Sequence, residues 1–344
     1  MNKPSVFERA SPPRLNRPRL GFAGLGWIGR HRLAALAASS AAEIVGLFDP
    51  VESARAHAAE LAADASCVSE FDELLALDLD GIVIATPNAL HAPQAIAALR
   101  AGKAVFCQKP LARTRGETEQ IIAAADSADR LLHVDLSYRF TTGMRQIREL
   151  IHSGALGRIY AVEAAFHNAY GPDKPWFYDP ALSGGGCLLD LGIHLIDLTL
   201  WCLDFPTVSN VTGHLLRTGE VVRRDRMAED YAAAQLLLAD GASLQLACSW
   251  RAPAGCDARI GLTFFGTAGG AGFANVDGSF YDFKAEHFLP DRSCRVLATP
   301  PENWGGRAVL AWVRRLTDSA AFDPEIRHLN QVADTIDRIY GRDL

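Results

Sequence analysis

The segment RLGFAGLGWIGRHRLAAL, which begins at Arg19, constrains the fold of this 344-residue chain more than any other. A short apolar run, residues 20–23, leads into Gly24-x-Gly26-x-x-Gly29, and an alanine-rich helical stretch follows. Gly24 permits a tight turn, Gly26 lets the backbone approach a pyrophosphate, and Gly29 lets the helix pack closely on its strand. The helix N-terminus would then hold the pyrophosphate. The pattern predicts the first βαβ unit of a dinucleotide-binding domain.

An acidic residue ends the second strand of this unit. Asp49 follows Gly29 by about 20 residues, at the end of EIVGLFD, where a carboxylate can hold adenosine ribose hydroxyls and would repel a 2′-phosphate. Pro50 and Val51, which come next, offer no cation. We therefore expect NAD to be preferred over NADP as the cofactor. The alternative is that Asp49 is a plain turn residue before a proline.

Strand-like and helix-like segments continue to alternate as far as residue 138. CVSEF, GIVIATP, AVFCQKP and the end of ADRLLHVDLSYRF read as strands, with helical patterns such as NALHAPQAIAALRAG between them. The alternation predicts a doubly wound parallel sheet, whose ligands bind at the carboxyl ends of the strands. ATPNALH (85–91) and QKP (108–110) lie at such ends. Lys109 is held by Pro110 in extended geometry; it is either a group aimed at a substrate oxygen or a solvated lysine.

A second segment, SGGGCLLDLGIHLIDLTLW (183–201), carries three ionisable groups in an otherwise apolar run. Asp190, His194 and Asp197 are spaced to share one face of a helix. A helix that is apolar nearly all round is usually buried, and buried charges are costly unless they are paired or used. The stripe is therefore either a catalytic face or a hydrogen-bonded cluster that only holds elements together. A metal site is disfavoured, because three ligands from one helix face rarely surround an ion.

Composition narrows the class of protein. The hydrophobic share of 49% and the charged share of 22% are typical of a globular protein, and the length favours two domains. The net charge of −6 argues against a nucleic-acid or anionic-membrane partner. Seven scattered cysteines suit reduced thiols in a cytoplasm. No apolar run is long enough for a transmembrane helix, and we expect the proline-containing residues 1–18 to form a disordered leader.

The second half is β-rich after an initial helix. RIYAVEAAFHN, AEDYAAAQLLLADGASLQLACSW and ARIGLTFFGTAGGAGFANV read as strands and hairpins. The second face of such a sheet needs a cover, so we expect a homodimer or homotetramer. A final amphipathic helix over 323–342 is expected to have a packing role.

Three blocks, GFAGLGWIG, CQKPLA and SGGGCLLDLGIHLIDL, resemble in order and separation the Gfo/Idh/MocA oxidoreductases, the glucose–fructose oxidoreductase and inositol dehydrogenase family. The resemblance covers roughly residues 19 to 342. It implies an N-terminal Rossmann domain (19–138) and a C-terminal α/β domain (139–344) built on a large open, mostly antiparallel sheet, often buried in a dimer or tetramer. It also implies NAD(P)-dependent hydride transfer between the nicotinamide and a secondary alcohol or ketone of a sugar, cyclitol or sugar derivative.

The resemblance assigns catalysis to Lys109, Asp190 and His194. His194 would take the hydroxyl proton, Lys109 would stabilise charge on the same oxygen and Asp190 would orient the pair, although Lys109 and His194 could exchange roles. The family commonly has Glu before the Lys-Pro pair, and this chain has Gln108. An amide favours a charged lysine less than a carboxylate does, but it can still hydrogen-bond a carboxamide or the backbone.

The sequence leaves two other functions open, a dinucleotide-bound sensor or co-regulator without turnover and an NAD-dependent glycoside hydrolase. The expected cofactor-binding residues are Gly24, Gly26, Trp27, Ile28, Gly29, Asp49, Thr86, Pro87, Asn88, His91, Gln108 and Lys109. The candidate substrate residues, from the stretch that precedes the three glycines, are His167, Asn168, Trp176 and Tyr178. Trp176 could equally be a packing residue.

Overall fold

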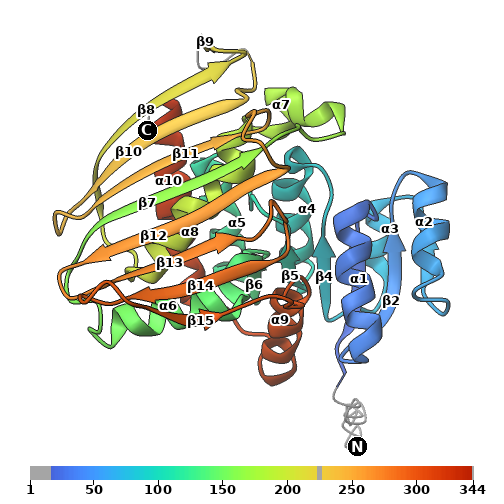
Figure 1. Cartoon of the computed structure of the whole chain (residues 1–344). Coiled ribbons are helices and arrows are strands. Elements are labelled where there is room, and N and C mark those ends of the chain that lie inside the picture. The colour runs from blue at the N-terminus through green and yellow to red at the C-terminus, as the bar shows by residue number, and fades with distance from the viewer. Residues whose placement is uncertain (1–16, 223–226, 343–344) are drawn as a thin grey trace, which may run out of the picture.

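The computed structural model describes residues 17–222 and 227–342, which build two β-sheets with their helices (Figure 1). Of the expected leader, residues 1–16 lie outside the described residues, so the prediction of disorder stays untested there. The first sheet lies to the right in Figure 1 and the second, larger sheet to the left.

Six parallel strands form the first sheet in the order β3-β2-β1-β4-β5-β6. They are β1 (Arg19–Ala23), β2 (Glu43–Phe48), β3 (Ser66–Val68), β4 (Gly81–Ile84), β5 (Ala104–Cys107) and β6 (Leu132–Val134). The connecting helices are α1 (Trp27–Ser39), α2 (Glu52–Ala59), α3 (Phe71–Ala76), α4 (Asn88–Arg100) and α5 (Arg115–Ala128). Every residue of β4 and β5 is buried, because helices cover both faces of central parallel strands. The predicted doubly wound sheet is confirmed.

The glycine-rich turn between β1 and α1 has the geometry that its sequence requires. Gly24 has a φ of +89°, and a Cβ there would lie 2.5 Å from the Ala85 carbonyl oxygen. A Cβ on Gly29 would lie 2.0 Å from the Gly24 carbonyl oxygen. Neither position can take a side chain without moving the backbone, so the turn and the close packing of α1 both depend on glycine.

The second sheet has nine strands in the order β15-β14-β13-β12-β7-β11-β10-β8-β9. Only the β7–β11 pair is parallel; the other neighbours are antiparallel. The strands are β7 (Ile159–Asn168), β8 (Val208–Arg217), β9 (Glu220–Val221), β10 (Tyr231–Leu238), β11 (Ser243–Ser249), β12 (Ala258–Gly266), β13 (Gly270–Asn275), β14 (Phe283–Phe288) and β15 (Cys294–Ala298). This is the mostly antiparallel sheet that the family resemblance implied.

Helices cover one face of this sheet and leave the other open. The helical elements of this half are η1 (Ser137–Phe140), α6 (Thr142–His152), η2 (Pro175–Tyr178), α7 (Pro180–Ser183), η3 (Leu188–Gly192), α8 (Ile193–Cys202), α9 (Arg307–Asp318), η4 (Pro324–His328) and α10 (Leu329–Tyr340). Figure 1 shows α6, α8 and α10 behind the sheet, and the strands bury alternate residues against them, such as Leu244 and Leu246 of β11. The final helix predicted over 323–342 is divided, because a 3₁₀ turn at η4 precedes α10.

Helix α9 follows the second sheet in the chain but packs against the first. Its Trp312 is fully buried and its ring lies 5.6 Å from that of Phe106 on β5. Of the described residues, one helical stretch, Pro180–Cys202, is long and apolar enough to cross a membrane by length and composition, and 89% of its most apolar window is buried inside the protein. This stretch is a core element of the second unit.

Candidate active site

Lys109 leaves the carboxyl end of β5 and reaches the second unit. Its Nζ donates to the Asp190 carboxylate Oδ1 at 2.6 Å and to the Asp190 carbonyl oxygen at 2.7 Å. Both side chains are largely buried, with 18% and 17% of their surface exposed. An ammonium group has three N–H donors, so one remains for a ligand. The structure thus brings together two of the three residues predicted to be catalytic.

Asp190 lies in a π-helical turn, η3, at the start of α8. Such turns are rare and are frequent at functional sites. The turn places the Asp190 carbonyl and carboxylate on the same ammonium group. It also changes the angular register, since a π-turn holds more residues than an α-turn. The predicted single stripe is therefore divided: Asp197, 1% exposed, lies in an ion pair with Arg139 of η1 and takes no part in the Lys109 cluster.

His194 lies next to this pair, on the first turn of α8. Its ring meets the Tyr138 ring edge-on at 4.8 Å and lies 6.1 Å from that of Phe166. Burial lowers the pKa of His194 well below 6.5, and the positive charge of Lys109 lowers it further. Among the described residues no hydrogen bond occupies its ring nitrogens. His194 is thus a neutral imidazole that can accept a proton.

Trp250, directly after β11, is a site residue that the sequence analysis missed. Its Nε1 donates to the Asp190 Oδ2 at 2.9 Å, so the two carboxylate oxygens are held separately by Lys109 and Trp250. The indole is 1% exposed and meets the Tyr178 ring at 5.3 Å. No motif surrounds Trp250. Tyr138 was also missed, although its place after β6 fits the rule that ligand sites gather at strand ends.

The glycine-rich turn is suited to a dinucleotide. A Cβ on Gly26 would meet no atom within 4 Å, and no side chain caps the α1 N-terminus, so its first N–H groups are available for a pyrophosphate. Trp27, on the first turn of α1, is 61% exposed, and Ile28 follows it in the chain. These features fit a bound cofactor that supplies a hydride acceptor.

Asp49 connects the ends of β1 and β2. Its Oδ2 accepts the Leu25 N–H at 2.8 Å and its Oδ1 accepts the Val51 N–H at 2.9 Å. A carboxylate has about four acceptor positions, so ribose hydroxyls can still be bound. Arg55 of α2 donates to the Asp49 carbonyl oxygen at 2.5 Å. Arg55 lies about one helical turn beyond Pro50 and Val51, so the residues that directly follow Asp49 do not reveal this cation.

Three other predicted cofactor residues have their side chains engaged within the protein. Thr86 donates to Gln94 at 2.6 Å, and Asn88 donates to the Ser183 carbonyl at 2.8 Å. The fully buried His91 ring lies 2.8 Å from both the Thr86 and Pro110 carbonyls. His91 thus connects the ATPN and QKP segments, and Pro87 is the N-cap residue of α4.

The four candidate substrate residues are placed differently. Tyr178 lies beside Trp250 and donates to the Pro172 carbonyl at 2.9 Å. Trp176 stacks on Phe177 at 3.8 Å, and the Asn168 Oδ1 is buried without a hydrogen bond among the described residues.

His167 lies on the open face of β7, where it contacts Ser249 and stacks on Tyr231. Its neighbour Phe166 faces His194, and alternate strand residues point to opposite faces. The His167 ring thus lies on the opposite face of the sheet from His194, and its part in substrate binding stays a prediction.

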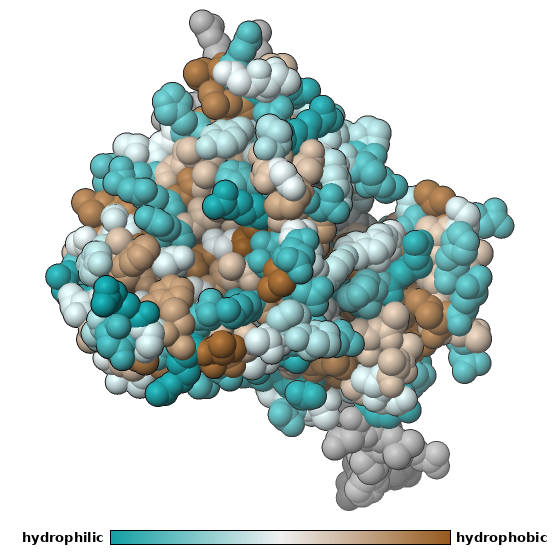
Figure 2. Space-filling model, in the orientation of Figure 1, coloured by the Kyte–Doolittle hydropathy of each residue, from teal (hydrophilic) through white to brown (hydrophobic). Residues whose placement is uncertain are grey.

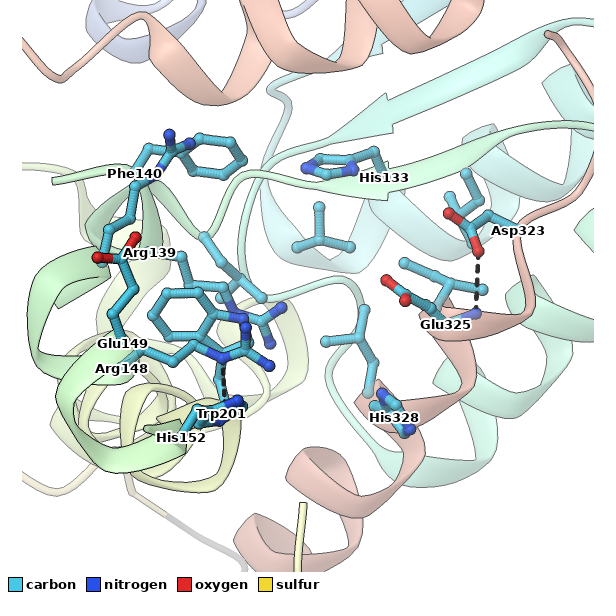
Figure 3. A pocket seen from close by; sticks show the side chains of 16 residues that line it. His133, Arg139, Phe140, Arg148, Glu149, His152, Trp201, Asp323, Glu325 and His328 are labelled. Atoms are coloured by element: carbon cyan, nitrogen blue, oxygen red, sulfur yellow. Dashed lines mark hydrogen bonds between the residues drawn. The ribbon is translucent and has the colours of Figure 1, made fainter. Parts of the chain in front are cut away.

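A cavity of about 460 Å³ is separate from this cluster (Figure 3). It lies along β6 between η1, α6, the end of α8 and η4, on the other side of η1 from Tyr138. Arg139 and Arg148 flank Trp201 on one wall, while Asp323 and Glu325 lie opposite. Asp197 and Asp204 already pair with these two arginines.

A smaller cavity, of about 310 Å³, lies beside Trp304. It is lined by polar groups of His31, Tyr281, Asp282 and Asn303, and by Trp304. The Trp304 ring lies 4.9 Å from that of Tyr138, which contacts His194. Its walls come from α1, from the turn before β14 and from the segment before α9.

Two domain families match the chain. The family described as "Oxidoreductase family, NAD-binding Rossmann fold" matches residues 19–136, and the "GFO/IDH/MocA C-terminal domain" matches residues 144–271. The rhizopine catabolism protein MocA of Rhizobium meliloti is 31% identical over 264 residues, which cover 74% of this chain and 78% of that protein. The D-glucoside 3-dehydrogenase of Escherichia coli K12 is 35% identical over 142 residues, which span 41% of this chain and 40% of the enzyme's own length.

Solved structures with the same fold extend over nearly the whole chain. GenD2 from gentamicin A biosynthesis, in complex with NAD, is 25% identical with a TM-score of 0.78 and 98% coverage of both chains. Levoglucosan dehydrogenase, in complex with NADH and levoglucosan, is 22% identical with a TM-score of 0.81 and covers 94% of this chain and 96% of its own. The family resemblance and the fold expected from it are confirmed. The chain belongs to the GFO/IDH/MocA family of oxidoreductases with an NAD-binding Rossmann fold.

Proposed function

We propose that the protein is an NAD(P)-dependent dehydrogenase or reductase that acts on a CH–OH group or the matching ketone of a sugar, cyclitol or sugar derivative. The observation that carries the proposal is the Lys109–Asp190 pair beside a neutral His194, at the carboxyl edge of the Rossmann sheet. Relatives named D-glucoside 3-dehydrogenase, 1,5-anhydro-D-fructose reductase and inositol 2-dehydrogenase support the substrate class. The cavity at His31, Tyr281 and Asn303 offers polar groups for further hydroxyls.

The proposed mechanism gives each side chain a role. In oxidation, the neutral His194 accepts the hydroxyl proton, and the third N–H of Lys109 donates to the same oxygen. Asp190 fixes the ammonium, and Trp250 fixes Asp190. A bound nicotinamide supplies the hydride acceptor. In reduction, the same groups act in reverse. A panel of sugars, inositols and sugar acids, assayed for NADH formation, tests the proposal; the absence of NADH formation with all of them, and of ketone reduction, would contradict it.

We propose further that NAD is preferred over NADP. The Asp49 carboxylate at the end of β2 would face a 2′-phosphate, whereas the nearby Arg55 is directed to the Asp49 carbonyl. Repulsion between two neighbouring anions that are partly exposed to water costs on the order of 1–2 kcal/mol, so we expect NADH to bind about tenfold more tightly than NADPH. Isothermal titration measures both affinities. Asp49→Ser should narrow the difference, and Asp64→Ser, at an exposed turn after α2, should not. Equal or tighter NADPH binding by the unaltered protein would exclude this preference.

The open face of the second sheet supports self-association. Register places Ala165, Ala233, Ala247, Gly261 and Ala274 side by side across five strands of this face. Figure 2 shows apolar and polar groups interspersed over it, and in Figure 1 no helix of the described residues lies in front of the sheet. Small side chains allow a second sheet to approach closely, and an uncovered sheet of this size is rarely left in water. We therefore propose a homodimer or homotetramer formed through this face.

Light scattering at micromolar concentration tests the assembly. We expect a mass of two or four chains for the unaltered protein and a mass near 37.2 kDa for Ala247→Arg, whose charge would stand in the middle of the row. Gln120→Arg, on the exposed face of α5, is the matched control and should keep the assembly. A single-chain mass for the unaltered protein would rule out self-association.

All seven cysteines are unpaired, which supports a reducing compartment, and we propose a cytoplasmic location.

A further inference from the structure

Gln108, directly after β5, uses both ends of its side-chain amide inside the protein. Its Oε1 accepts the main-chain N–H of Lys109 at 3.1 Å, and its Nε2 donates to the Asp135 Oδ2 at 2.8 Å. The orientation of the amide follows from its partners, because an ionised carboxylate can only accept and a main-chain N–H can only donate. Gln108 therefore connects the end of β6 to the backbone of the lysine that enters the active site.

Asp135 is a buried charge with a complete set of partners. It is 1% exposed and lies just after β6. Besides Gln108, it accepts from the Arg32 Nε at 2.5 Å and from the Ser137 hydroxyl. Arg32, 5% exposed on α1, also donates to the Ser137 Oγ at 2.9 Å and to the His31 Nδ1 at 2.9 Å. A charge can be kept at this depth only with such pairing.

We propose that Asp135 is the positioning carboxylate of the cofactor pocket, and that Gln108 is the amide through which it holds the Lys109 segment. The inference rests on the proposed function, since the pocket is that of the proposed cofactor. The carboxylate that the family commonly carries beside the lysine is present here just after β6, in hydrogen-bond contact with the side chain at position 108. A glutamate at 108 would direct an oxygen at Asp135 where the Gln108 Nε2 now donates. Glutamine in place of glutamate at position 108 is thus matched by the neighbouring carboxylate of Asp135.

The isosteric change Gln108→Glu separates charge from shape. Two facing carboxylates raise the pKa of one member, so a glutamate at 108 would be protonated over a wider pH range than usual. In that form its O–H can donate to Asp135 as the amide does. The penalty is therefore absent below the raised pKa and grows as pH rises through it. The other charged or titratable groups that face the pair are Arg32 and His31 from α1, Cys107 and Lys109 from the β5 segment, and His133 from β6.

Exchanging the amide at position 108 with the carboxylate at position 135 provides the decisive variant. Arg32 and Gln108 both donate to the same oxygen of Asp135, so a carboxylate at 108 would lie next to the Arg32 guanidinium. The double variant Gln108→Glu with Asp135→Asn keeps the net charge, the amide–carboxylate hydrogen bond and a counter-ion for Arg32. The double variant should recover the NADH affinity and the unfolding temperature that each single change lowers.

The experiment compares the unaltered protein, the two single variants and the double variant by thermal unfolding and by calorimetric titration with NADH, each at pH 8 and pH 5. We expect Gln108→Glu to bind NADH about tenfold more weakly than the unaltered protein at pH 8, because neighbouring groups in one hydrogen-bond network have coupling energies of this order. At pH 5 its NADH affinity should approach that of the unaltered protein. Asp135→Asn should be weakened at both pH values. The double variant should come within about threefold of the unaltered protein. Gln120→Glu on the exposed face of α5 is the control for the charge change and should show no effect.

Three results would overturn the proposal. The first is an unchanged NADH affinity and unfolding temperature in Gln108→Glu at both pH values, and the second is a loss of NADH affinity in Gln108→Glu that is the same at both pH values. The third is a double variant whose loss of NADH affinity equals the losses of the two single variants multiplied together. Gln108→Leu, which removes the amide without adding charge, covers the case in which a charged variant does not fold, and its deficit must be independent of pH. None of these readouts needs turnover. A protein that oxidises no sugar or cyclitol would contradict the proposed function and leave this test intact.

Discussion

Replacing Lys109 with methionine is expected to lower kcat for a sugar or cyclitol substrate by about 10³-fold, while the protein stays folded and still binds NADH. The change removes the N–H that would donate to the substrate oxygen, and groups of this kind contribute factors of about 10² to 10⁴. Methionine keeps an unbranched chain of similar length. Asp190 retains the Trp250 donor at 2.9 Å and 17% of its side-chain surface is exposed to water, so the loss of its partner does not leave an isolated buried charge.

The strand β5 itself supplies the control for this variant. Lys103 stands at the other end of β5, where its Nζ donates to the Leu77 carbonyl at 3.2 Å. Lys103→Met removes the same charge far from the carboxyl edge of the sheet and should leave kcat within about twofold of the unaltered value. Steady-state kinetics and NADH titration of both variants measure the difference. A Lys109→Met protein with kcat within tenfold of normal would remove Lys109 from the mechanism.

The sequence predicted those parts of the fold that local chemistry determines. Gly24 and Gly29 are needed because any Cβ there meets backbone atoms, and such positions show directly in a sequence. The buried runs of β4 and β5 likewise require cover on both faces. The packing of α9 on the first sheet could not be predicted in this way, because its partner Phe106 is some 200 residues earlier in the chain and only the tertiary fold brings them together.

Site residues that belong to a sequence motif could be predicted, whereas those that join the site through a single hydrogen bond could not. Lys109, Asp190 and His194 lie in recognisable blocks, whereas Trp250 enters only through its Nε1 bond to Asp190. The division of the Asp190–Asp197 stripe depends on one π-turn, which regular helix spacing does not reveal. The surroundings of Gln108 could not be predicted for the same reason. The carboxylate that compensates for glutamine at position 108 is Asp135, and the two residues are neighbours only because β5 and β6 pair in the folded sheet.

Replacing His194 with alanine is expected to lower kcat by about 10² or more, the usual contribution of a general acid–base residue, with a much smaller effect on stability. A histidine that only held a buried network would behave in the opposite way, since its removal would leave a partner unsatisfied and lower the unfolding temperature. The His194 ring contacts the rings of Tyr138 and Phe166, and among the described residues it leaves behind no hydrogen-bond partner that would need replacing. Kinetics and thermal unfolding of the same sample distinguish the two roles.

The pH dependence of the unaltered enzyme gives an independent check on His194. Burial and the Lys109 charge hold its pKa well below 6.5, so the neutral form that accepts a proton persists as pH falls through that value. In the oxidation direction, kcat should therefore stay level across pH 6.5 and decline only at lower pH, where the imidazole becomes protonated. An exposed histidine in the same role would lose half its activity near 6.5. A rate profile with its midpoint at 6.5 would contradict the lowered pKa of His194, and near-normal turnover in His194→Ala would show that the proton goes to another group.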